Sequence, residues 1–583
     1  MTAPGRHALR EAVLLLAVCG LAFVWRLGSN GVWDLDEGLY AACAREMLLS
    51  GDAVTPRVNG VPFFEKPPLA YWAAAASMAA FGRSEWSLRL PSALAASLTA
   101  FLTWWIARRV FGPRAGLPAG VFFALAPLVL AAGRMLTMDA LLMLWVSAAL
   151  ACWLAAQGER RGALAAAGFW TACGLGVLTK GAVGVLLPVL IVAIHLAARE
   201  GWRPGALWAG FGALRPAWGI PLLIAVAAPW HLAAWRAEGQ AFVEEYIVRQ
   251  HLGRFRGGDT AHRAPFWFFV PALLAGAFPW SAFVPLALAG HWSRGLEGAR
   301  QASWLRAWFW VVFLFFSASG SKLVSYILPC FPAAAALAGG WVASTEGSAA
   351  ARRAWRGACV VAAATGALLL AAAVAFEPIV GAVARYGGRP FPLDETARAI
   401  AAAAARLGGV TAASGCVALL LAWADRRREA VAALGAGMAL FAAAAVHGGL
   451  ALAERRVLAP LHGLAREAGN RLEAGAPLRV VIAGPRRPSV LFYLPDSAFA
   501  PGRRVLEDGD VEAANRWLRE TPGALALTDA TRAARLVAMG AGRVAATRGG
   551  WALVESRAVS VRTHGEERGG DRLPSHGAGR VPR

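Results

Sequence analysis

The chain has 583 residues, of which 57% are hydrophobic and only 16% are charged, and its formal net charge is +22. Soluble globular proteins carry about 25% charged residues, so this composition excludes an ordinary soluble enzyme and indicates a protein with many membrane spans. The positive charge comes from short arginine clusters between apolar segments, which are typical of cytoplasmic loops rather than of a nucleic-acid-binding surface.

Apolar stretches of about 20 residues, the length that crosses a bilayer, recur over the first 455 residues. The first of them follows Arg6 and Arg10 without a clear cleavage site after it, so we interpret it as a span rather than as a signal peptide. Thirteen spans are predicted, at 9–26, 87–110, 115–132, 138–157, 162–179, 182–198, 217–235, 266–290, 304–319, 323–344, 356–376, 404–424 and 429–452.

The arginines set the orientation of these spans. With the N-terminus in the cytoplasm, every inner loop is short and basic, as the positive-inside rule requires. This topology leaves three longer segments, 27–86, 236–265 and 377–400, on the outer face of the membrane. The third is rich in Gly, Pro and Arg and is predicted to be a plain loop.

The first outer segment is predicted to hold two interfacial helices, near 37–49 and 67–81. Asp34, Asp36 and Glu37 stand at the start of the first helix, where carboxylates also serve as caps. For Asp34 both interpretations stay open. For the Asp36–Glu37 pair we favour function, because a carboxylate beside a low-dielectric wall suits a general base or a metal ligand.

The stretch FFEKPP in the same segment contains Glu65 and Lys66. A lysine at the membrane interface can hold a lipid phosphate as a point charge, or it can simply extend its ammonium group to water. The chain has only three lysines, and all three, Lys66, Lys180 and Lys322, map to the outer ends of predicted spans. We treat this placement as a hint of function.

Further polar residues follow at the outer face. Asp139 lies in the short turn between spans 115–132 and 138–157, where it is either a helix cap or a functional acid. Lys322 and Tyr326 are one helical turn apart and should point the same way. The second outer segment is either a solvated loop or a site for phosphate, metal or proton transfer; it holds Glu244, Glu245, His251, Arg254, Arg256, His262 and Arg263.

From about residue 455 the chain is soluble in character and predicts a small α/β domain on the outer face. The predicted strands are 477–484, 489–494, 524–529 and 551–556, and the predicted helices are 512–520 and 531–540. We therefore divide the chain into a membrane domain (1–454), a periplasmic α/β domain (455–562) and a disordered tail (563–583).

These residues, in this order, resemble the bacterial membrane glycosyltransferases of the GT-C fold. The likeness is greatest to the lipid A aminoarabinose transferases and to their protein O-mannosyltransferase relatives, and it covers residues 10–340 well. The stretches that carry it are DEGLYAACAREMLLSGDAVTPRVNGVPFFEKPPLAYW, RMLTMDALLM, LTKG, HLGRF with HRAPFW, and SKLVSYILPCFP. The resemblance implies an all-α polytopic membrane fold with a small C-terminal α/β domain.

The resemblance also implies roles for individual residues. Asp36, beside Glu37, matches the leading catalytic acid, and Asp139 matches a second acid. The other matched residues are Lys66, Arg254, Lys322 and Tyr326 for the donor phosphate, Tyr40 for the cavity, and Glu65 and His251 for a divalent metal such as Zn, Mg or Mn. Leu39 and Phe63 depart from the pattern, which often has arginine and tyrosine there, and both would line the acceptor side.

The implied reaction is transfer of a sugar, with inversion, from a polyprenyl-phosphate donor to a lipid A-like or other cell-envelope acceptor on the periplasmic face. Two alternatives stay open: an enzyme that glycosylates proteins, like the O-mannosyltransferases, and a transporter or flippase of the same lipid. Transport is the weaker, because transporters place their ionisable groups near mid-membrane between repeats. No nucleic-acid partner is expected.

Overall fold

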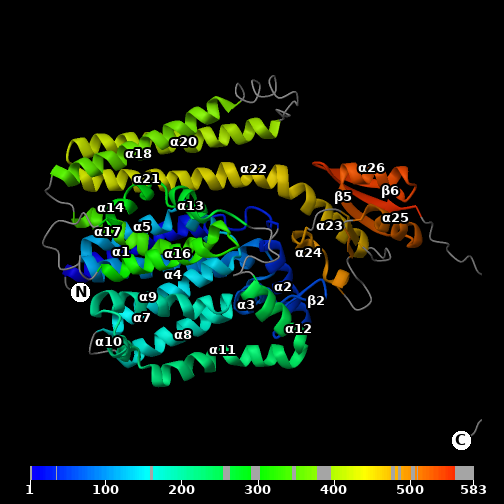
Figure 1. The fold of residues 1–583 in the computed structure, drawn as a ribbon. Coiled ribbons are helices and arrows are strands. Elements are labelled where there is room, and N and C mark those ends of the chain that lie inside the picture. The colour runs from blue at the N-terminus through cyan, green and yellow to red at the C-terminus, as the bar shows by residue number, and fades with distance from the viewer. Residues whose placement is uncertain are drawn as a thin grey trace, which may run out of the picture.

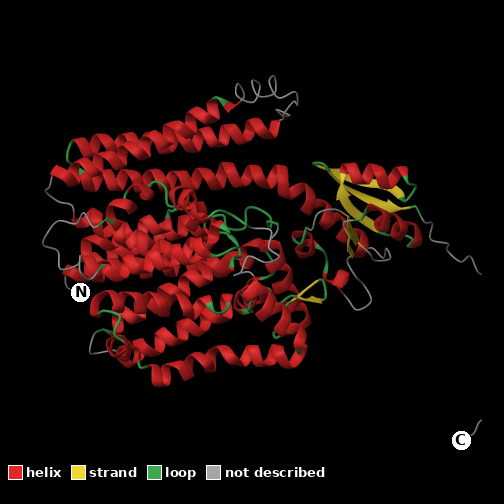
Figure 2. Cartoon of the chain, viewed as in Figure 1, coloured by secondary structure: helices red, strands yellow, loops and turns green. Residues whose placement is uncertain are grey.

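A computed structural model describes most of the chain. The described residues are 3–34, 36–157, 162–253, 263–289, 302–344, 349–376, 395–473, 480–483, 487–499, 506–508 and 510–557. The disordered tail predicted at 563–583 lies outside these residues, and so does most of the loop predicted at 377–400. Residues 395–400 of that loop are described and form the start of a helix, which corrects the prediction there. Figures 1 and 2 show a large helical bundle with a small mixed sheet beside one end of it.

The bundle is built from long apolar helices that lie side by side (Figure 1). Those of the N-terminal half are α1 (Ala3–Cys19) continued by η1 (Gly20–Val24), α4 (Glu85–Phe111), α5 (Pro113–Ala124), α6 (Pro127–Gly133), α7 (Met138–Ala156), α8 (Gly162–Lys180), α9 (Val183–Glu200), α10 (Pro204–Phe211), η2 (Gly212–Leu214) and α11 (Pro216–Glu238). Each predicted span in this half coincides with one of these helices or helix pairs.

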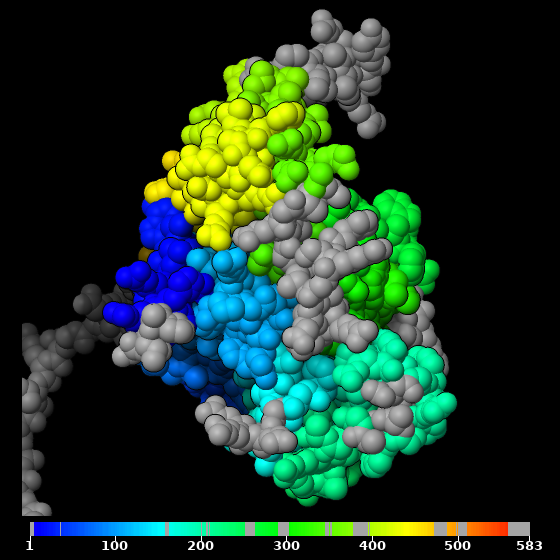
Figure 3. Space-filling model, turned by 90° about the vertical axis from the view of Figure 1, so that its left-hand side faces the viewer, coloured from blue at the N-terminus to red at the C-terminus, as the bar shows by residue number. Residues whose placement is uncertain are grey.

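The C-terminal half adds helices of more varied length. They are α12 (Gln240–Phe242), η3 (Val243–Gly253), η4 (Phe266–Phe268), α13 (Phe269–Gly276), η5 (Trp280–Ala282), α14 (Val284–Leu288), α16 (Ser303–Ala318), η6 (Val324–Cys330), α17 (Phe331–Ser344), α18 (Ala349–Val374), α20 (Glu395–Trp423), α21 (Arg427–Ala444), η7 (Ala445–Leu450), α22 (Ala451–Ala453), η8 (Glu454–Leu458) and α23 (Ala459–Glu473). Viewed end-on, α18, α20 and α21 form one lobe of the bundle and α8 to α11 lie at the opposite side (Figure 3).

The prediction of a polytopic helical membrane protein is confirmed. Among the described residues, nine helices are long and apolar enough to cross a bilayer, or up to eleven if two bent pairs each count as one span. The bent pairs are Pro113–Ala124 with Pro127–Gly133, at 65°, and Phe266–Gly276 with Trp280–Leu288, at 119°. Two further predicted spans correspond to apolar helices that are shorter than a full span, Val183–Arg199 and Ser303–Ala318.

Both predicted interfacial helices of the first outer segment are present, as α2 (Asp36–Ser50) and α3 (Leu69–Phe81). Two consecutive prolines lead into α3, and the second of them, Pro68, occupies its N-cap, where a missing N–H costs nothing. Between the helices, β1 (Arg57–Val58) pairs antiparallel with β2 (Val61–Pro62). The two helices lie at the end of the bundle that faces the sheet (Figure 1).

The C-terminal sheet has five strands in the order β4-β3-β5-β7-β6. The strands are β3 (Val480–Ala483), β4 (Leu506–Asp508), β5 (Leu525–Asp529), β6 (Gly542–Arg548) and β7 (Trp551–Ser556). β3 runs parallel to β4 and β5, whereas β5, β7 and β6 are antiparallel neighbours. Helices α25 (Val511–Glu520) and α26 (Ala530–Ala538) match their predictions, while β4 and β6 were not predicted.

One predicted strand is wrong: residues 489–494 form the short helix α24 (Ser489–Tyr493). An apolar run of this length does not distinguish strand from helix. The helix is favoured by a distant residue, since the Asp34 Oδ1 atom accepts a hydrogen bond of 2.9 Å from the Ser489 N–H in its first turn. Such a contact cannot be read from the local sequence.

The outer helices and the C-terminal region share one hydrophobic core. Buried side chains of α2 and α3, such as Cys43 and Tyr71, belong to the same cluster as Leu464 of α23, Leu491 of α24 and Leu527 of β5. The first outer segment is therefore packed against the C-terminal region, although Asp34 and Ser489 are 455 residues apart along the chain.

Candidate active site

The phenol of Tyr40, on α2, marks the point where the predicted acids meet. Tyr40 is 7% exposed, and its pKa is raised well above 10, first by burial and then by the negative charges of Asp36, Asp139 and Glu65. Tyr326 contributes to the same shift. The charges of residues on α2, α7, η6 and the loop before α3 therefore act on one buried phenol.

Asp139 is held by side chains from two other elements. Lys180, the last residue of α8, donates a hydrogen bond to its Oδ1 atom, and Ser325 of η6 donates one of 2.7 Å to Oδ2. The Lys180 ammonium also lies 4.0 Å from the centre of the Tyr326 ring. The Thr137 hydroxyl caps α7 by accepting a hydrogen bond of 3.3 Å from the Ala140 N–H, so Asp139 itself is not the N-cap.

Lys180 and Ser325 were not among the predicted site residues. The scarcity of lysine was a signal for Lys180, which the structure places beside Asp139. Nothing in the sequence distinguishes Ser325 from other serines, because its role depends on how η6 packs against α7.

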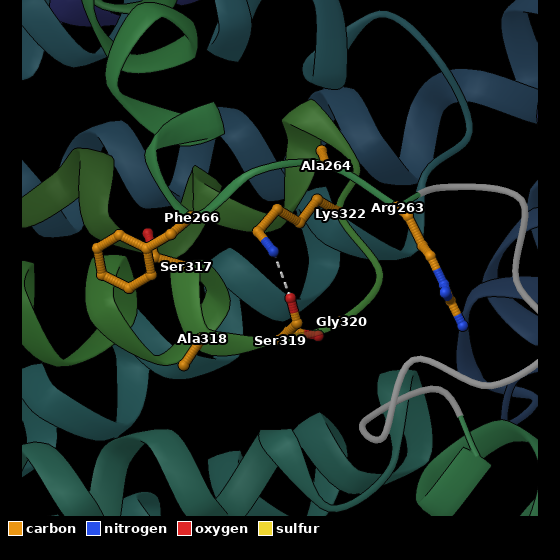
Figure 4. Close-up of a pocket in the computed structure, with 8 residues that line it drawn as sticks. All are labelled: Arg263, Ala264, Phe266, Ser317, Ala318, Ser319, Gly320 and Lys322. Atoms are coloured by element: carbon orange, nitrogen blue, oxygen red, sulfur yellow. Dashed lines mark hydrogen bonds between the residues drawn. The ribbon is translucent and has the colours of Figure 1, made fainter.

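A cavity of about 490 Å³ is lined in part by Lys322, three residues before Ser325 in the chain. Its walls come from the turn after α16 and from the segment before η4, which an isolated bridge between Arg263 and Ser321 holds together. The Lys322 ammonium donates to the Ser319 carbonyl oxygen inside it (Figure 4). The lining residues are Arg263, Ala264, Phe266, Ser317, Ala318, Ser319, Gly320 and Lys322.

The loop that holds Glu65 and Lys66 is fixed from both sides by aromatic residues. Phe63 packs into the core that α2 and α3 share with the C-terminal region, whereas Phe64 packs against Trp230 of α11 in a separate cluster. Lys66 is 8% exposed, and its ammonium donates a hydrogen bond of 3.0 Å to the Glu65 carbonyl oxygen. The loop geometry therefore holds a lysine inside the protein rather than at its surface.

Glu37, which the sequence suggested as catalytic, has a structural role instead. Its carboxylate forms two hydrogen bonds with Arg89, of 2.7 and 2.8 Å, and both side chains have 0% exposure. The carboxylate also accepts hydrogen bonds of 2.9 Å from the Trp33 N–H and 3.0 Å from the Leu136 N–H. A carboxylate so enclosed cannot meet a substrate, so the prediction for Glu37 is corrected.

Its neighbour Asp36 differs in its exposure to solvent. Asp36 is the first residue of α2 and is exposed, so its carboxylate is accessible. The loop before it is anchored by Asp34, which accepts from the Ser489 N–H and lies 3.4 Å from Arg487. Asp34 therefore caps α24 rather than its own helix.

Two predicted residues cannot be placed in full. Arg254 lies outside the described residues, and His251 lies in η3 with a side chain that is outside them. Within the part of the chain that the structure describes, no group of three or more His, Cys, Asp or Glu residues could hold a metal ion. The predicted metal site needs the His251 side chain, which lies outside the described residues, and we derive no chemical step through a metal.

The sequence of this chain is similar to those of known proteins. A family model described as dolichyl-phosphate-mannose-protein mannosyltransferase matches residues 65–224. An undecaprenyl phosphate-alpha-4-amino-4-deoxy-L-arabinose arabinosyl transferase 2 of Pseudomonas fluorescens is 35% identical over 332 residues, which are 56% of this chain and 58% of the relative. A transferase of the same name from Sodalis glossinidius is 34% identical over 351 residues, or 59% of this chain and 61% of that protein. The match thus spans about three fifths of each relative.

Solved structures show the same fold over nearly the whole chain. ArnT from Cupriavidus metallidurans bound to undecaprenyl phosphate superimposes with a TM-score of 0.76 and 26% identity, covering 96% of this chain and 99% of that one. Its apo state gives a TM-score of 0.75, with 27% identity and 94% and 98% coverage. The resemblance to the GT-C glycosyltransferases is therefore confirmed, and the chain is a multi-pass membrane protein with the fold of ArnT.

Proposed function

We propose that this protein is a glycosyltransferase that moves a sugar from a polyprenyl-phosphate carrier to a lipid A-like or other cell-envelope acceptor. The observation that carries the proposal is the cluster in which Lys180 and Ser325 hold Asp139 and Lys180 faces the Tyr326 ring. The charges of Asp36, Asp139 and Glu65 act on the buried Tyr40 phenol, and the buried Lys322 lines a cavity. The relatives are named as transferases that use an undecaprenyl-phosphate sugar, and the solved ArnT structure contains undecaprenyl phosphate. A protein acceptor is the alternative, in keeping with the matched family model.

The cations of the site suit the leaving group. Lys322 and Lys66 are almost fully buried, and a lysine ammonium in a low-dielectric environment strongly stabilises a phosphate anion. As the bond between the anomeric carbon and the phosphate oxygen breaks, negative charge builds on the lipid phosphate. Preorganised positive charge at that position would be the main catalytic contribution. Arg254, which the resemblance assigns to the phosphate, would join them.

The acids suit the acceptor. In the proposed step the acceptor oxygen attacks the anomeric carbon from the face opposite the phosphate, and its proton, where it has one, passes to Asp36. Asp36 is the accessible acid, whereas Asp139 is held by Lys180 and Ser325. We assign Asp36 the role of base and Asp139 that of fixing Lys180 and η6 beside the sugar.

We further propose that thirteen spans cross the inner membrane with the site on the periplasmic face, within a membrane domain of residues 1–454. The short arginine-rich loops support this orientation. The location of α2 and α3 at the same end of the bundle as the C-terminal sheet also supports it, because both segments are then outside (Figure 1). A divalent metal shared by Glu65 and His251 stays a prediction.

Transfer by the purified, reconstituted protein tests the function. Vesicles would contain a radiolabelled polyprenyl-phosphate sugar and lipid A, and labelled lipid A would be separated and counted. We expect label on lipid A with the wild-type chain and none with Asp36→Asn or Lys66→Ala. Asp425→Asn is a matched control, since Asp425 is 56% exposed in the turn between α20 and α21 and should keep full activity.

The outcomes separate the candidate functions. Label that crosses the bilayer without reaching any acceptor would indicate a flippase and overturn the proposal. Label that reaches a co-reconstituted peptide but not lipid A would keep the enzyme class and change the acceptor. Full transfer by Asp36→Asn would overturn the assigned site.

A further inference from the structure

We propose that the C-terminal α/β region holds the loop and helix that carry Asp36 and Tyr40 in their working position, and that Arg45 is the positioning residue. This inference rests on the proposed function. It concerns how the site is built rather than which groups react, and no residue of the C-terminal region is assigned to the chemistry.

The loop before α2 is bound to the C-terminal region at successive residues. The Gly31 N–H donates to a Glu454 carboxylate oxygen at 2.5 Å, and the Val32 N–H donates to the Tyr493 hydroxyl oxygen at 2.8 Å. Asp34 follows, with its contact to α24. Hydrogen bonds at Gly31, Val32 and Asp34 thus fix the course of the chain up to two positions before Asp36.

Arg45 fixes the other side of α2. Its side chain is 1% exposed in the ion pair with Asp496, and it donates hydrogen bonds of 2.6 Å to the Leu491 carbonyl oxygen and 2.9 Å to the Leu494 carbonyl oxygen. These carbonyls belong to α24 and to the residue after it. Burial lowers the pKa of Arg45 to about 10, so the guanidinium stays charged at neutral pH.

The packing between α2 and α24 leaves no room for adjustment. A Cβ atom at Gly38 would lie 2.6 Å from the Ser489 backbone nitrogen, and one at Gly31 would lie 2.4 Å from the His462 ring. Both distances are shorter than real contacts of a Cβ atom. The two elements therefore approach at backbone distance, and α2 cannot shift toward α24.

The consequence reaches the site because Asp36, Tyr40 and Arg45 share one helix of 15 residues. An α-helix is stiff over this length, so releasing it at Arg45 would displace the residues of its first turns together. Displacements of about 1 Å can reduce a reaction rate roughly 100-fold without removing any reacting group. Arg45 would therefore act on kcat through the placement of Asp36.

The test replaces Arg45 in the full-length protein. Arg45→Lys keeps the charge but loses the fork that reaches two carbonyls, and Arg45→Met removes the charge. We expect kcat for sugar transfer to fall about 10-fold to 100-fold, with a change in donor KM below about threefold. Arg535→Met is the matched control on α26 of the same region, where Arg535 is 63% exposed, and it should keep wild-type kcat.

Hydrogen exchange supplies a readout that does not depend on activity. Amides of residues 36–42 should exchange faster in Arg45→Lys than in the wild type, while those of α7 and α8 should be unchanged. If Arg45→Met does not accumulate, Arg45→Lys carries the test. Wild-type kcat together with wild-type exchange in Arg45→Lys would overturn the inference. Faster exchange in Arg45→Lys, combined with a wild-type protein that itself transfers no sugar, would overturn the proposed function alone.

Discussion

Two buried ion pairs stand close together at this end of the molecule, and they differ in what surrounds them. Glu37 and Arg89 are both 0% exposed, whereas the side chains of Asp139 and Lys180 keep 11% and 10% exposure. The first pair binds the backbone around it. Besides their mutual bonds, its members contact backbone groups of Leu27, Asn30, Gly31, Trp33 and Leu136.

The second pair binds side chains. Asp139 takes its remaining hydrogen bond from the Ser325 hydroxyl, and Lys180 faces the Tyr326 ring. A charge that is saturated by backbone groups fixes the shape of the chain and cannot take part in chemistry. A charge that is held by side chains beside a cavity can respond to a bound anion. The groups that surround an ion pair, rather than its burial, therefore distinguish a structural pair from one that belongs to the active site.

The largest expected effect is on the first pair. Arg89→Met leaves the Glu37 carboxylate buried without its counter-ion, which costs about 3–5 kcal/mol. We expect a large fall in the melting temperature in detergent, or loss of the folded protein from the membrane. The double variant Glu37→Gln with Arg89→Met should be less damaged than the single one. A melting temperature within 2 °C or so of the wild type would contradict the structural role of this pair.

The second pair should show the opposite behaviour. Asp139→Asn and Lys180→Met should each reduce kcat by about 100-fold or more, because Lys180 and η6 are then no longer held in place beside the sugar. Their melting temperatures should fall less than that of Arg89→Met. If the melting temperatures of these variants fall as far as that of Arg89→Met, both ion pairs are structural and the distinction between them is wrong.

The cavity cations should affect donor binding as well as turnover, because the donor phosphate is already charged before its bond to the sugar breaks. Lys322→Ala removes a charge-assisted interaction of about 1.5–3 kcal/mol, so the donor KM should rise roughly 10-fold to 100-fold. Arg263→Ala, on the opposite wall of the same cavity, should have a smaller effect of the same kind. Initial rates over a range of donor concentrations measure both, and an unchanged KM in Lys322→Ala would exclude this cavity as the phosphate site.

Tyr40→Phe should give the smallest change. The charges of Asp36 and Asp139, together with burial, raise the pKa of Tyr40 well above 10, so the phenol stays protonated at every working pH. It can donate a hydrogen bond but cannot act as a base, and its loss should reduce kcat by a few-fold. The pH–rate profiles of wild type and variant should coincide below pH 10. A limb of the wild-type profile in that range that disappears in the variant would contradict this assignment.

The fold could be predicted to a large extent because hydrophobic runs and arginine clusters are local signals. The interfacial helices α2 and α3 are set by a carboxylate start and by two prolines, which are also local. The helix α24 was missed because its first N–H is bound by Asp34, far away in the sequence. Local patterns do not contain that information.

The site was predicted in part for the same reason. Asp36 and Glu37 are adjacent acids with the same local pattern, and only the position of Arg89 decides that one is structural. The charge of Asp139 acts on Tyr40, although the two residues are about 100 positions apart in the sequence. Lys180 could have been included on composition alone, whereas Ser325 depends on packing that the sequence does not reveal.

The continuous helical stretch from Arg427 to Arg471 has 45 residues. At about 1.5 Å per residue it extends about 67 Å, more than twice the hydrocarbon thickness of roughly 30 Å. One end is embedded in lipid, and the other, through α23, packs into the core beneath the acid-bearing loop. One chain segment thus links the apolar bundle to the core on which the acid-bearing loop rests.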